Sequence, residues 1–282
     1  MAVATALTSE FRAGEIRWHP PPPAREDAFS ARIPGGAMTT PPFDTEDLFD
    51  EDYLHFAARP LEETSDAAAG LVERLLELRP GERVLDLACG HGRIANRLAA
   101  RGLEVSGLDI TPVFLDRARQ DAHERGVEVD YVRGDMRELP WTGHFDAIVN
   151  WFTAFGYFDD AGNRRVLDQA RQALRPGGRL LLELNNQAHV LRAFQQAIVH
   201  EADGDLLVDR HRLDPLTSRN IVERTIVRAG RVRRFHYFTR MFAFPELRDW
   251  LLAAGFDEVE GFGEDGGPLT ADSRRMLVLA RR

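Results

Sequence analysis

The stretch that decides the fold is VLDLACGHGR, residues 84–93. An apolar run that contains Asp86 leads into a turn with Gly90 and Gly92, and a helical pattern follows. Glycine has no Cβ to keep a ligand away, and the first turn of a helix has free N–H groups. Only a small side chain would fit at Ala88, inside the same turn. The stretch therefore predicts a nucleoside-binding turn in an α/β domain.

A second carboxylate, Asp109, closes the apolar run at residues 103–108 and lies 23 positions after Asp86. That spacing is about one strand–helix–strand unit, and a carboxylate placed there can accept both hydroxyls of a ribose. The glycines match a nicotinamide fingerprint equally well. Asp86 favours S-adenosylmethionine instead, because a carboxylate in the turn attracts a cationic amino group and repels a pyrophosphate.

Further strands and helices alternate along the chain. Strand-like runs cover residues 127–132, 145–150 and 179–184, and helical spacing fits residues 67–78, 94–101, 112–125 and 161–174. This alternation predicts an α/β fold with a doubly wound, mostly parallel sheet. Asp135, which follows the first of these three strands in the triplet Gly-Asp-Met, is placed to accept a hydrogen bond from an adenine amino group.

With these motifs in their usual order, residues 79–282 resemble the class I S-adenosylmethionine-dependent methyltransferases. The resemblance implies a seven-stranded Rossmann-like sheet, with residues 256–261 and 275–280 at its antiparallel end, and S-adenosylmethionine as the cofactor. It also implies that residues 86–92 wrap the methionine part, that Asp109 and Ile110 hold the ribose, and that Asp135 and Met136 frame the adenine. Ala88 departs from the family, which more often has glycine there.

The segment before the domain divides into two parts. Residues 1–44 are rich in Pro, Ala and Gly, so we expect a disordered or extended arm. Residues 45–78 resemble the N-terminal helical lid of glycine-type and sugar-type methyltransferases, in which an aromatic residue covers the sulfonium and an arginine binds the cofactor carboxylate. Tyr53 and Arg59 would take these roles, with cation–π attraction favouring the tyrosine. Surface positions on a helix are the alternative for both.

An insertion separates the fifth strand from the end of the sheet. Residues 186–243 are far longer than an ordinary connection between elements. Within them, residues 206–209, 220–227 and 231–238 show strand patterns, and Ala229-Gly230 predicts a hairpin turn. We expect a small antiparallel substrate lid over the cofactor mouth, with residues 79–185 forming the cofactor-binding core and residues 244–282 completing its sheet.

The loop NWFTAFGYF, residues 150–158, follows a strand where ligands sit in open α/β sheets, so it should line the reaction chamber. Asn150 and Phe152 are expected against the cofactor. The loop lacks the Asn/Asp-Pro-Pro-aromatic motif of enzymes that methylate nucleobase amines, and it resembles the loop of sugar-amine and other natural-product methyltransferases. In those, the position of Tyr157 is polar and near the acceptor, so Tyr157 is a candidate catalytic residue, with aromatic packing as its alternative.

Two further catalytic candidates lie on the last expected strand of the lid. His236 could serve as a base, and Arg240 could bind an anionic substrate; the alternative for each is a structural role. An even number of positions separates them, so they share one face while Tyr237 lies on the other. The pattern does not determine which face points inward. A base is needed only where the acceptor must lose a proton.

Composition excludes several other classes. The chain has 282 residues, 44% of them hydrophobic, which is enough for one large domain. Its single cysteine, Cys89, rules out an internal disulfide and a thiolate iron–sulfur cluster. Lysine is absent, which excludes a Schiff-base enzyme. No cluster of residues has metal-ligand spacing, so no metal is expected.

The net charge of −9 argues against non-specific nucleic-acid binding, and no apolar run is long enough for a membrane helix. We therefore expect a cytoplasmic enzyme that methylates an oxygen or nitrogen of a small molecule, with a specialised metabolite as the expected class and with neither nucleic acid nor membrane as a partner. The alternatives are a methyltransferase acting on RNA or protein and a cofactor-bound protein without transfer activity. The oligomeric state is open, a homodimer being one option.

Overall fold

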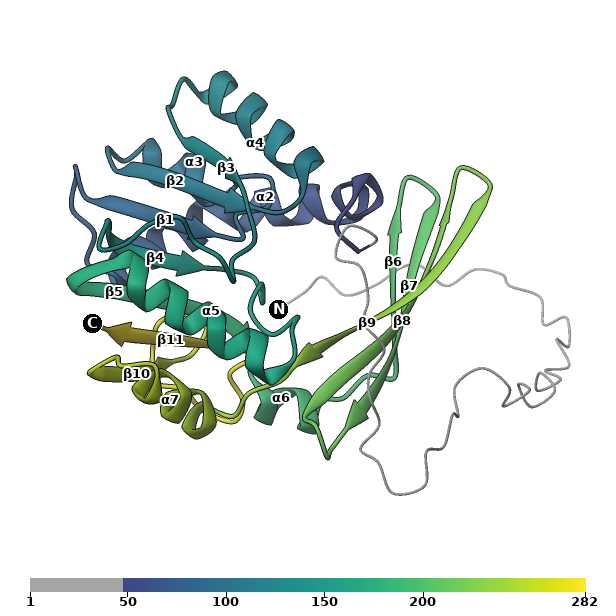
Figure 1. Cartoon of the computed structure of the whole chain (residues 1–282). Coiled ribbons are helices and arrows are strands. Elements are labelled where there is room, and N and C mark those ends of the chain that lie inside the picture. The colour runs from purple at the N-terminus through teal and green to yellow at the C-terminus, as the bar shows by residue number, and fades with distance from the viewer. Residues whose placement is uncertain (1–47) are drawn as a thin grey trace, which may run out of the picture. The chain divides into compact units, whose positions relative to one another are not determined.

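The computed structural model describes residues 48–282, and Figure 1 shows how their elements are arranged. The expected N-terminal arm, residues 1–44, lies outside the described residues. The described chain contains a seven-stranded sheet, mostly parallel, and a separate four-stranded antiparallel sheet. The predicted fold class, a doubly wound sheet with an inserted small antiparallel sheet, is confirmed.

The strand order of the large sheet brings the ends of its central strands together. The order is β10-β11-β5-β4-β1-β2-β3, and the two strands at the β10 edge are antiparallel to their neighbours. The carboxyl ends of parallel strands meet at one edge, so Asp109 and Asn150, the last residues of β2 and β4, lie beside the end of β1. The strands are β1 (Arg83–Leu87), β2 (Glu104–Asp109), β3 (Asp130–Arg133), β4 (Phe145–Asn150), β5 (Leu174–Asn185), β10 (Glu258–Phe262) and β11 (Arg275–Arg281).

The helices are α2 (Glu51–Leu75), α3 (Ala95–Ala99), α4 (Pro112–Arg125), α5 (Asp160–Ala173), α6 (Gln187–Arg192) and α7 (Phe244–Ala253). Local signals set the limits of α4, because Pro112 suits a first helical position and Gly126 ends the helix at a φ of 65°. Helix α2 begins at Glu51, earlier than the apolar spacing predicts, and continues through Pro60. None of the helices in residues 48–282 combines the length and apolar character needed to cross a membrane.

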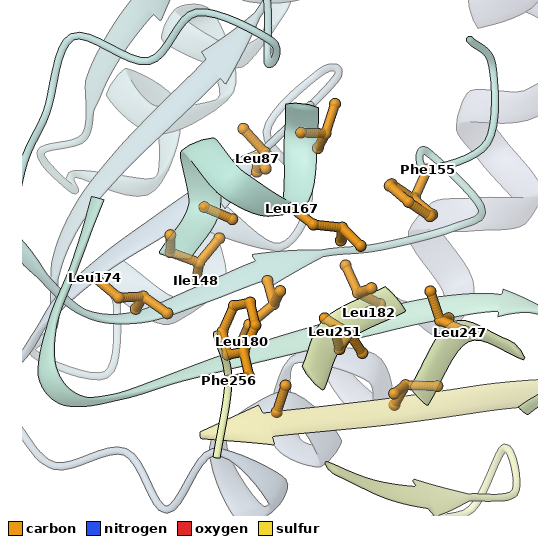
Figure 2. Packing of buried hydrophobic residues seen from close by; sticks show 14 of the residues in the cluster. Leu87, Ile148, Phe155, Leu167, Leu174, Leu180, Leu182, Leu247, Leu251 and Phe256 are labelled. Atoms are coloured by element: carbon orange, nitrogen blue, oxygen red, sulfur yellow. The ribbon is translucent and has the colours of Figure 1, made fainter. Parts of the chain in front are cut away.

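Two hydrophobic clusters flank the large sheet. One lies under α5 and α7 and contains Leu87, Ile148, Leu167 and Leu251, which Figure 2 shows packed together. The other is formed with α2, α3 and α4 and takes the alternate strand residue Val84. Because successive strand residues point to opposite faces, one apolar strand supplies both clusters. The sheet is therefore covered on both faces, and its strand ends are left for the site.

The four-stranded sheet comprises β6 (Ala197–Ala202), β7 (Asp205–Asp214), β8 (Arg219–Arg228) and β9 (Arg231–Arg240), in that order. The predicted turn at Ala229-Gly230 is confirmed, since Arg228 pairs with Arg231 and the two turn residues have φ angles of 49° and 74°. Two positive φ values are what a type I′ hairpin needs. Strand β6 escaped prediction because most of its side chains are exposed and show little apolar alternation.

Candidate functional site

The turn after β1 winds through left-handed backbone. Ala88, Gly90 and Gly92 have φ angles of 58°, 55° and 75°. An alanine is strained in this region, which gives a physical reason for the glycine more usual at position 88. The two glycines differ in their surroundings. A Cβ at residue 90 would meet nothing closer than 3.9 Å, whereas one at residue 92 would overlap the hydroxyl of Tyr131. Gly92 is therefore required by packing.

Asp86 lies at the base of this turn and is 2% exposed. Its Oδ2 accepts a hydrogen bond from the backbone N–H of Ala95, at 3.1 Å. Burial raises the pKa of Asp86 to about 7, because the ionised form loses its water. A cationic group from a ligand would restore the charged form.

Asp109, the last residue of β2, is also buried, and its charge acts on Asp86. Its Oδ2 accepts from the N–H of Gly90 at 2.8 Å, and its Oδ1 accepts from the N–H of Thr111 at 2.9 Å. Burial raises the pKa of this carboxyl as well. Each oxygen of a carboxylate has a further lone pair, so Asp109 can still accept from a pair of hydroxyls. Ile110, the next residue, is half-buried.

Asp135 follows β3 and is engaged by a neighbour that the sequence did not indicate. Both of its oxygens accept from Arg137, at 2.5 to 3.1 Å. The guanidinium of Arg137 in turn lies 4.2 Å from the ring centre of Phe158. Met136 is half-buried against the cluster under α5. An adenine amino group at Asp135 would share this carboxylate with Arg137.

The loop after β4 contains strained backbone. Asn150 is fully buried, and its Nδ2 donates to the carbonyl of Leu87 at 2.8 Å, which joins the ends of β4 and β1. Phe152 and Thr153 have φ angles of 64° and 55°. Two consecutive left-handed residues other than glycine cost about 1–3 kcal/mol each and persist where surroundings enforce them.

A buried ion pair holds this strained turn. Glu183 of β5 accepts from the N–H of Phe152 at 2.5 Å, and its backbone carbonyl accepts from the N–H of Thr153 at 2.9 Å. Arg275 of β11 pairs with Glu183 and donates to the hydroxyl of Thr153 at 2.6 Å. The ring of Phe152 stays 45% exposed. Such strain favours a functional role for the loop.

Five rings form an aromatic cluster, which connects the predicted lid helix, the loop after β4 and the small sheet. The ring of Phe49 lies 5.5 Å from that of Tyr53 and 5.4 Å from that of Tyr157. Tyr53 also lies 5.5 Å from Phe114, in the first turn of α4, and Tyr157 stacks on Tyr237 at 6.4 Å. Burial raises the pKa of Tyr53 and of Tyr157, so both phenols stay protonated at neutral pH. Tyr53 and Tyr157, predicted from distant segments, are thus brought together.

A polar network in the small sheet contacts this cluster through Tyr237. Arg224 of β8 donates to both oxygens of Asp209, each at 2.7 Å, and to the hydroxyl of Tyr237 at 3.0 Å. Tyr237 pairs with Val222 across the strands, whereas His236 pairs with Glu223, so His236 lies on the opposite face of the sheet. The structure does not bring His236 together with Tyr157.

Arg240 is buried where β9 meets the core. Its guanidinium pairs with Glu246 of α7 and lies 3.4 Å from Asp160 of α5. Its backbone N–H donates to the carbonyl of Gly156 at 2.7 Å. These contacts tie the small sheet to the loop that carries Tyr157. Arg59 belongs to α2, but its side chain is outside the described part of the structure.

Sequence reasoning missed Arg93, Phe49 and the pair Glu183–Arg275. The position of Arg93 directly after Gly92 was a signal that could have found it, because a cation next to a nucleoside-binding turn is available to an anionic ligand group. The other three act through contacts with distant segments, for which the sequence carries no local sign. Among residues 48–282, no three His, Cys, Asp or Glu side chains lie together as a metal site.

Residues 84–178 match the family described as a methyltransferase domain. The chain is 40% identical over 114 residues to the demethylmenaquinone methyltransferase of Thermus thermophilus, a match that covers 39% of this chain and 50% of that protein. Its similarity to the cypemycin N-terminal methyltransferase of a Streptomyces species is 29% identity over 221 residues, or 76% of this chain and 89% of that protein. The chain thus spans half of the first relative and most of the second.

The fold also resembles that of solved methyltransferase structures. The CcbJ methyltransferase from Streptomyces caelestis superposes with a TM-score of 0.68 and 24% identity, over 83% of this chain and 99% of that chain. At this identity the likeness concerns the fold. It extends well beyond residues 84–178 and so includes elements outside the matched family domain.

Proposed function

We infer that this chain, which belongs to the class I S-adenosylmethionine-dependent methyltransferases, methylates an oxygen or nitrogen of a small organic molecule, with a specialised metabolite as the expected class. The observation that carries this proposal is the aromatic cluster. It joins α2, the strained loop after β4 and the inner face of the small sheet beside the nucleoside-binding turn. Aromatic walls with a few polar groups suit a small organic ligand.

The residues around the turn fit the cofactor. We assign Asp86 to its amino group, Asp109 and Ile110 to the ribose, and Asp135 and Met136 to the adenine. The left-handed turn at residues 88–92 leaves room for the cofactor at Gly90, where the atom nearest to an added Cβ would be on the ring of Phe114, at 3.9 Å. When bound, S-adenosylmethionine supplies a methyl group already activated by positive sulfur.

The chain's own contribution is mainly alignment, which can supply about 7–11 kcal/mol of a barrier. The buried phenol of Tyr157 stays protonated, so it donates a hydrogen bond to the acceptor and does not remove its proton. An acceptor that arrives as a free amine needs no base before attack. The name of the cypemycin N-terminal methyltransferase indicates a nitrogen acceptor for that relative. Amines therefore belong among the first acceptors to test here.

The hairpin formed by β8 and β9 carries four arginines, which is the feature that favours RNA or protein as the acceptor: Arg228, Arg231, Arg233 and Arg234. Arg228 lies 2.7 Å from Asp52, and Arg233 pairs with Asp50 and Asp52 at the start of α2. Two of the four charges are thus neutralised by contacts with the start of α2, while Arg231 and Arg234 remain exposed. The reduced free charge of the hairpin, together with the aromatic cluster, favours a small-molecule acceptor over RNA or protein.

Incubation of the purified chain with methyl-labelled S-adenosylmethionine and a cell extract tests the proposal. We expect label in the small-molecule fraction, and no label there with the variant Asp109→Ala, which loses the ribose contact. Label confined to protein or RNA would contradict the proposal and restore the macromolecular alternative.

A further inference from the structure

Arg93 is a buried cation that forms no ion pair within residues 48–282, although the charges of Glu183 and Asp86 act on it from a longer distance. It directly follows the nucleoside-binding turn and is 8% exposed. Among residues 48–282, no carboxylate lies within ion-pair distance of its guanidinium. Its Nη1 donates a hydrogen bond to the hydroxyl of Ser65 on α2, at 3.3 Å. Burial lowers the pKa of Arg93, because the charged form has lost water. A charge buried in this way is costly unless a counter-charge arrives.

Other buried arginines of the chain show the contrast. Arg97, four residues later, lies 2.8 Å from Asp66 and 2.7 Å from Glu62. Arg224 donates to both oxygens of Asp209. Carboxylates contact these two guanidinium groups directly. The direct side-chain contacts of the Arg93 guanidinium within residues 48–282 are the hydroxyl of Ser65 and the ring of Phe152, whose centre is 5.3 Å away, while Glu183 acts only through its longer-range charge. Among the buried arginines of residues 48–282, Arg93 thus lacks a carboxylate at ion-pair distance and is available to an external anion.

The surroundings of Arg93 define what anion fits. Asp86 and Arg93 interact electrostatically, and each favours the charged form of the other. Burial raises the pKa of Tyr53, of the aromatic cluster, and the charge of Arg93 opposes this rise. A carboxylate and a guanidinium that interact beside a nucleoside-binding turn match the ammonium and the carboxylate of an α-amino acid group.

We propose that Arg93 binds the carboxylate of the methionine part of the cofactor, opposite the ammonium at Asp86. The proposal rests on the proposed function and adds to it the residue that recognises the amino-acid end. It gives to Arg93 the role that resemblance to other methyltransferases suggests for Arg59. Ser65 and Phe152 then act as positioning residues, because they hold the guanidinium between α2 and the strained loop.

Calorimetric titration with two adenosyl ligands tests this assignment without any methyl acceptor. S-Adenosylhomocysteine carries the carboxylate, and decarboxylated S-adenosylhomocysteine differs only by its loss. We expect the wild-type chain to prefer the first by about 10- to 100-fold, as hydrogen bonds between charged groups provide. Arg93→Met should reduce this preference to about twofold or less by weakening the first ligand alone. Arg93→Lys should restore part of it, since lysine keeps the charge but not the forked geometry.

Two matched variants serve as controls. Arg97→Met removes a buried arginine of the same segment whose charge is already paired, and Arg59→Met removes the sequence-based candidate; both should keep the wild-type preference. Arg93→Gln gives the same comparison if Arg93→Met does not fold. Equal weakening of both ligands by the Arg93 variants, or loss of the preference in Arg59→Met, would overturn the assignment. Failure of the wild-type chain to bind S-adenosylhomocysteine would instead count against the proposed function.

Discussion

Alanine at position 92 should destabilise the fold more than alanine at position 90, although both glycines belong to the same turn. Gly90 and Gly92 have φ angles of 55° and 75°, so an alanine at either site is strained by about 1–2 kcal/mol. Only at Gly92 does the new methyl group also meet other atoms. It would overlap the hydroxyl of Tyr131 and lie 2.8 Å from the Cβ of Ala118.

The difference between the two variants can be estimated from these contacts. Overpacking a filled core costs about 1–3 kcal/mol, so we expect a loss of about 2–5 kcal/mol for Gly92→Ala and about 1–2 kcal/mol for Gly90→Ala. The entropy that alanine removes from the unfolded chain is the same in both and cancels in the comparison. Urea denaturation followed by circular dichroism measures the difference directly, with each kcal/mol corresponding to about 2–4 °C in a thermal scan.

A third variant identifies the cause. Tyr131→Phe removes the hydroxyl that the methyl group would overlap, at the cost of its 2.6 Å hydrogen bond to Asn96. In this background Gly92→Ala should cost measurably less than in the wild type, which a double-mutant cycle detects. Equal destabilisation by Gly90→Ala and Gly92→Ala, or an unchanged cost in the Tyr131→Phe background, would refute the packing argument.

Two further predictions concern buried charges. Burial raises the pKa of Asp86 to about 7 in the folded state, above its value of about 4 in the unfolded chain. The stability that protonated Asp86 contributes is therefore fully present below about pH 4 and is lost as the pH rises through about 7. Urea midpoints measured across this range should decline less in Asp86→Asn than in the wild type, and equal slopes would contradict this. Arg275→Met should destabilise the fold by about 3–5 kcal/mol, because it leaves the carboxylate of Glu183 unpaired in a side chain that is only 7% exposed. Arg240→Met should cost about 1–3 kcal/mol, because the side chain of its partner Glu246 is 34% exposed and regains water. Urea denaturation of both variants measures the two losses in the free energy of unfolding, and a larger loss in Arg240→Met than in Arg275→Met would contradict the prediction.

The sequence predicted the large sheet well because its signals are local. The run at residues 145–150 matches β4, and Pro112 with Gly126 bounds α4, since each of these boundaries depends on neighbouring residues. Apolar spacing alone placed the start of α2 too late, although the resemblance implied a helical lid over residues 45–78, and α6, α7 and β6 were not predicted. Helix α6 is short and has no buried residue, and β6 is mostly exposed, so neither carries a strong apolar pattern. Helix α7 does carry one, since Phe244, Leu247, Trp250 and Leu251 have helical spacing, and this signal was overlooked.

The candidate site was predicted less completely. Alternation correctly placed His236 and Tyr237 on opposite faces of β9, but it could not say which face points inward, because both faces carry aromatic residues. The stacking of Tyr237 on Tyr157 decides this, and it is a contact between segments far apart in the chain. The environment of Arg93 likewise depends on Ser65, which belongs to α2 and is far from Arg93 in the sequence.

A calorimetric titration with S-adenosylmethionine, repeated with a nicotinamide dinucleotide, tests the central claim that Asp86 and Asp109 together hold the methyl donor. We predict clear binding of S-adenosylmethionine, weaker binding in both Asp86→Ala and Asp109→Ala, and no heat with the dinucleotide. Binding of the dinucleotide in place of S-adenosylmethionine, or an affinity for S-adenosylmethionine that neither substitution changes, would contradict it.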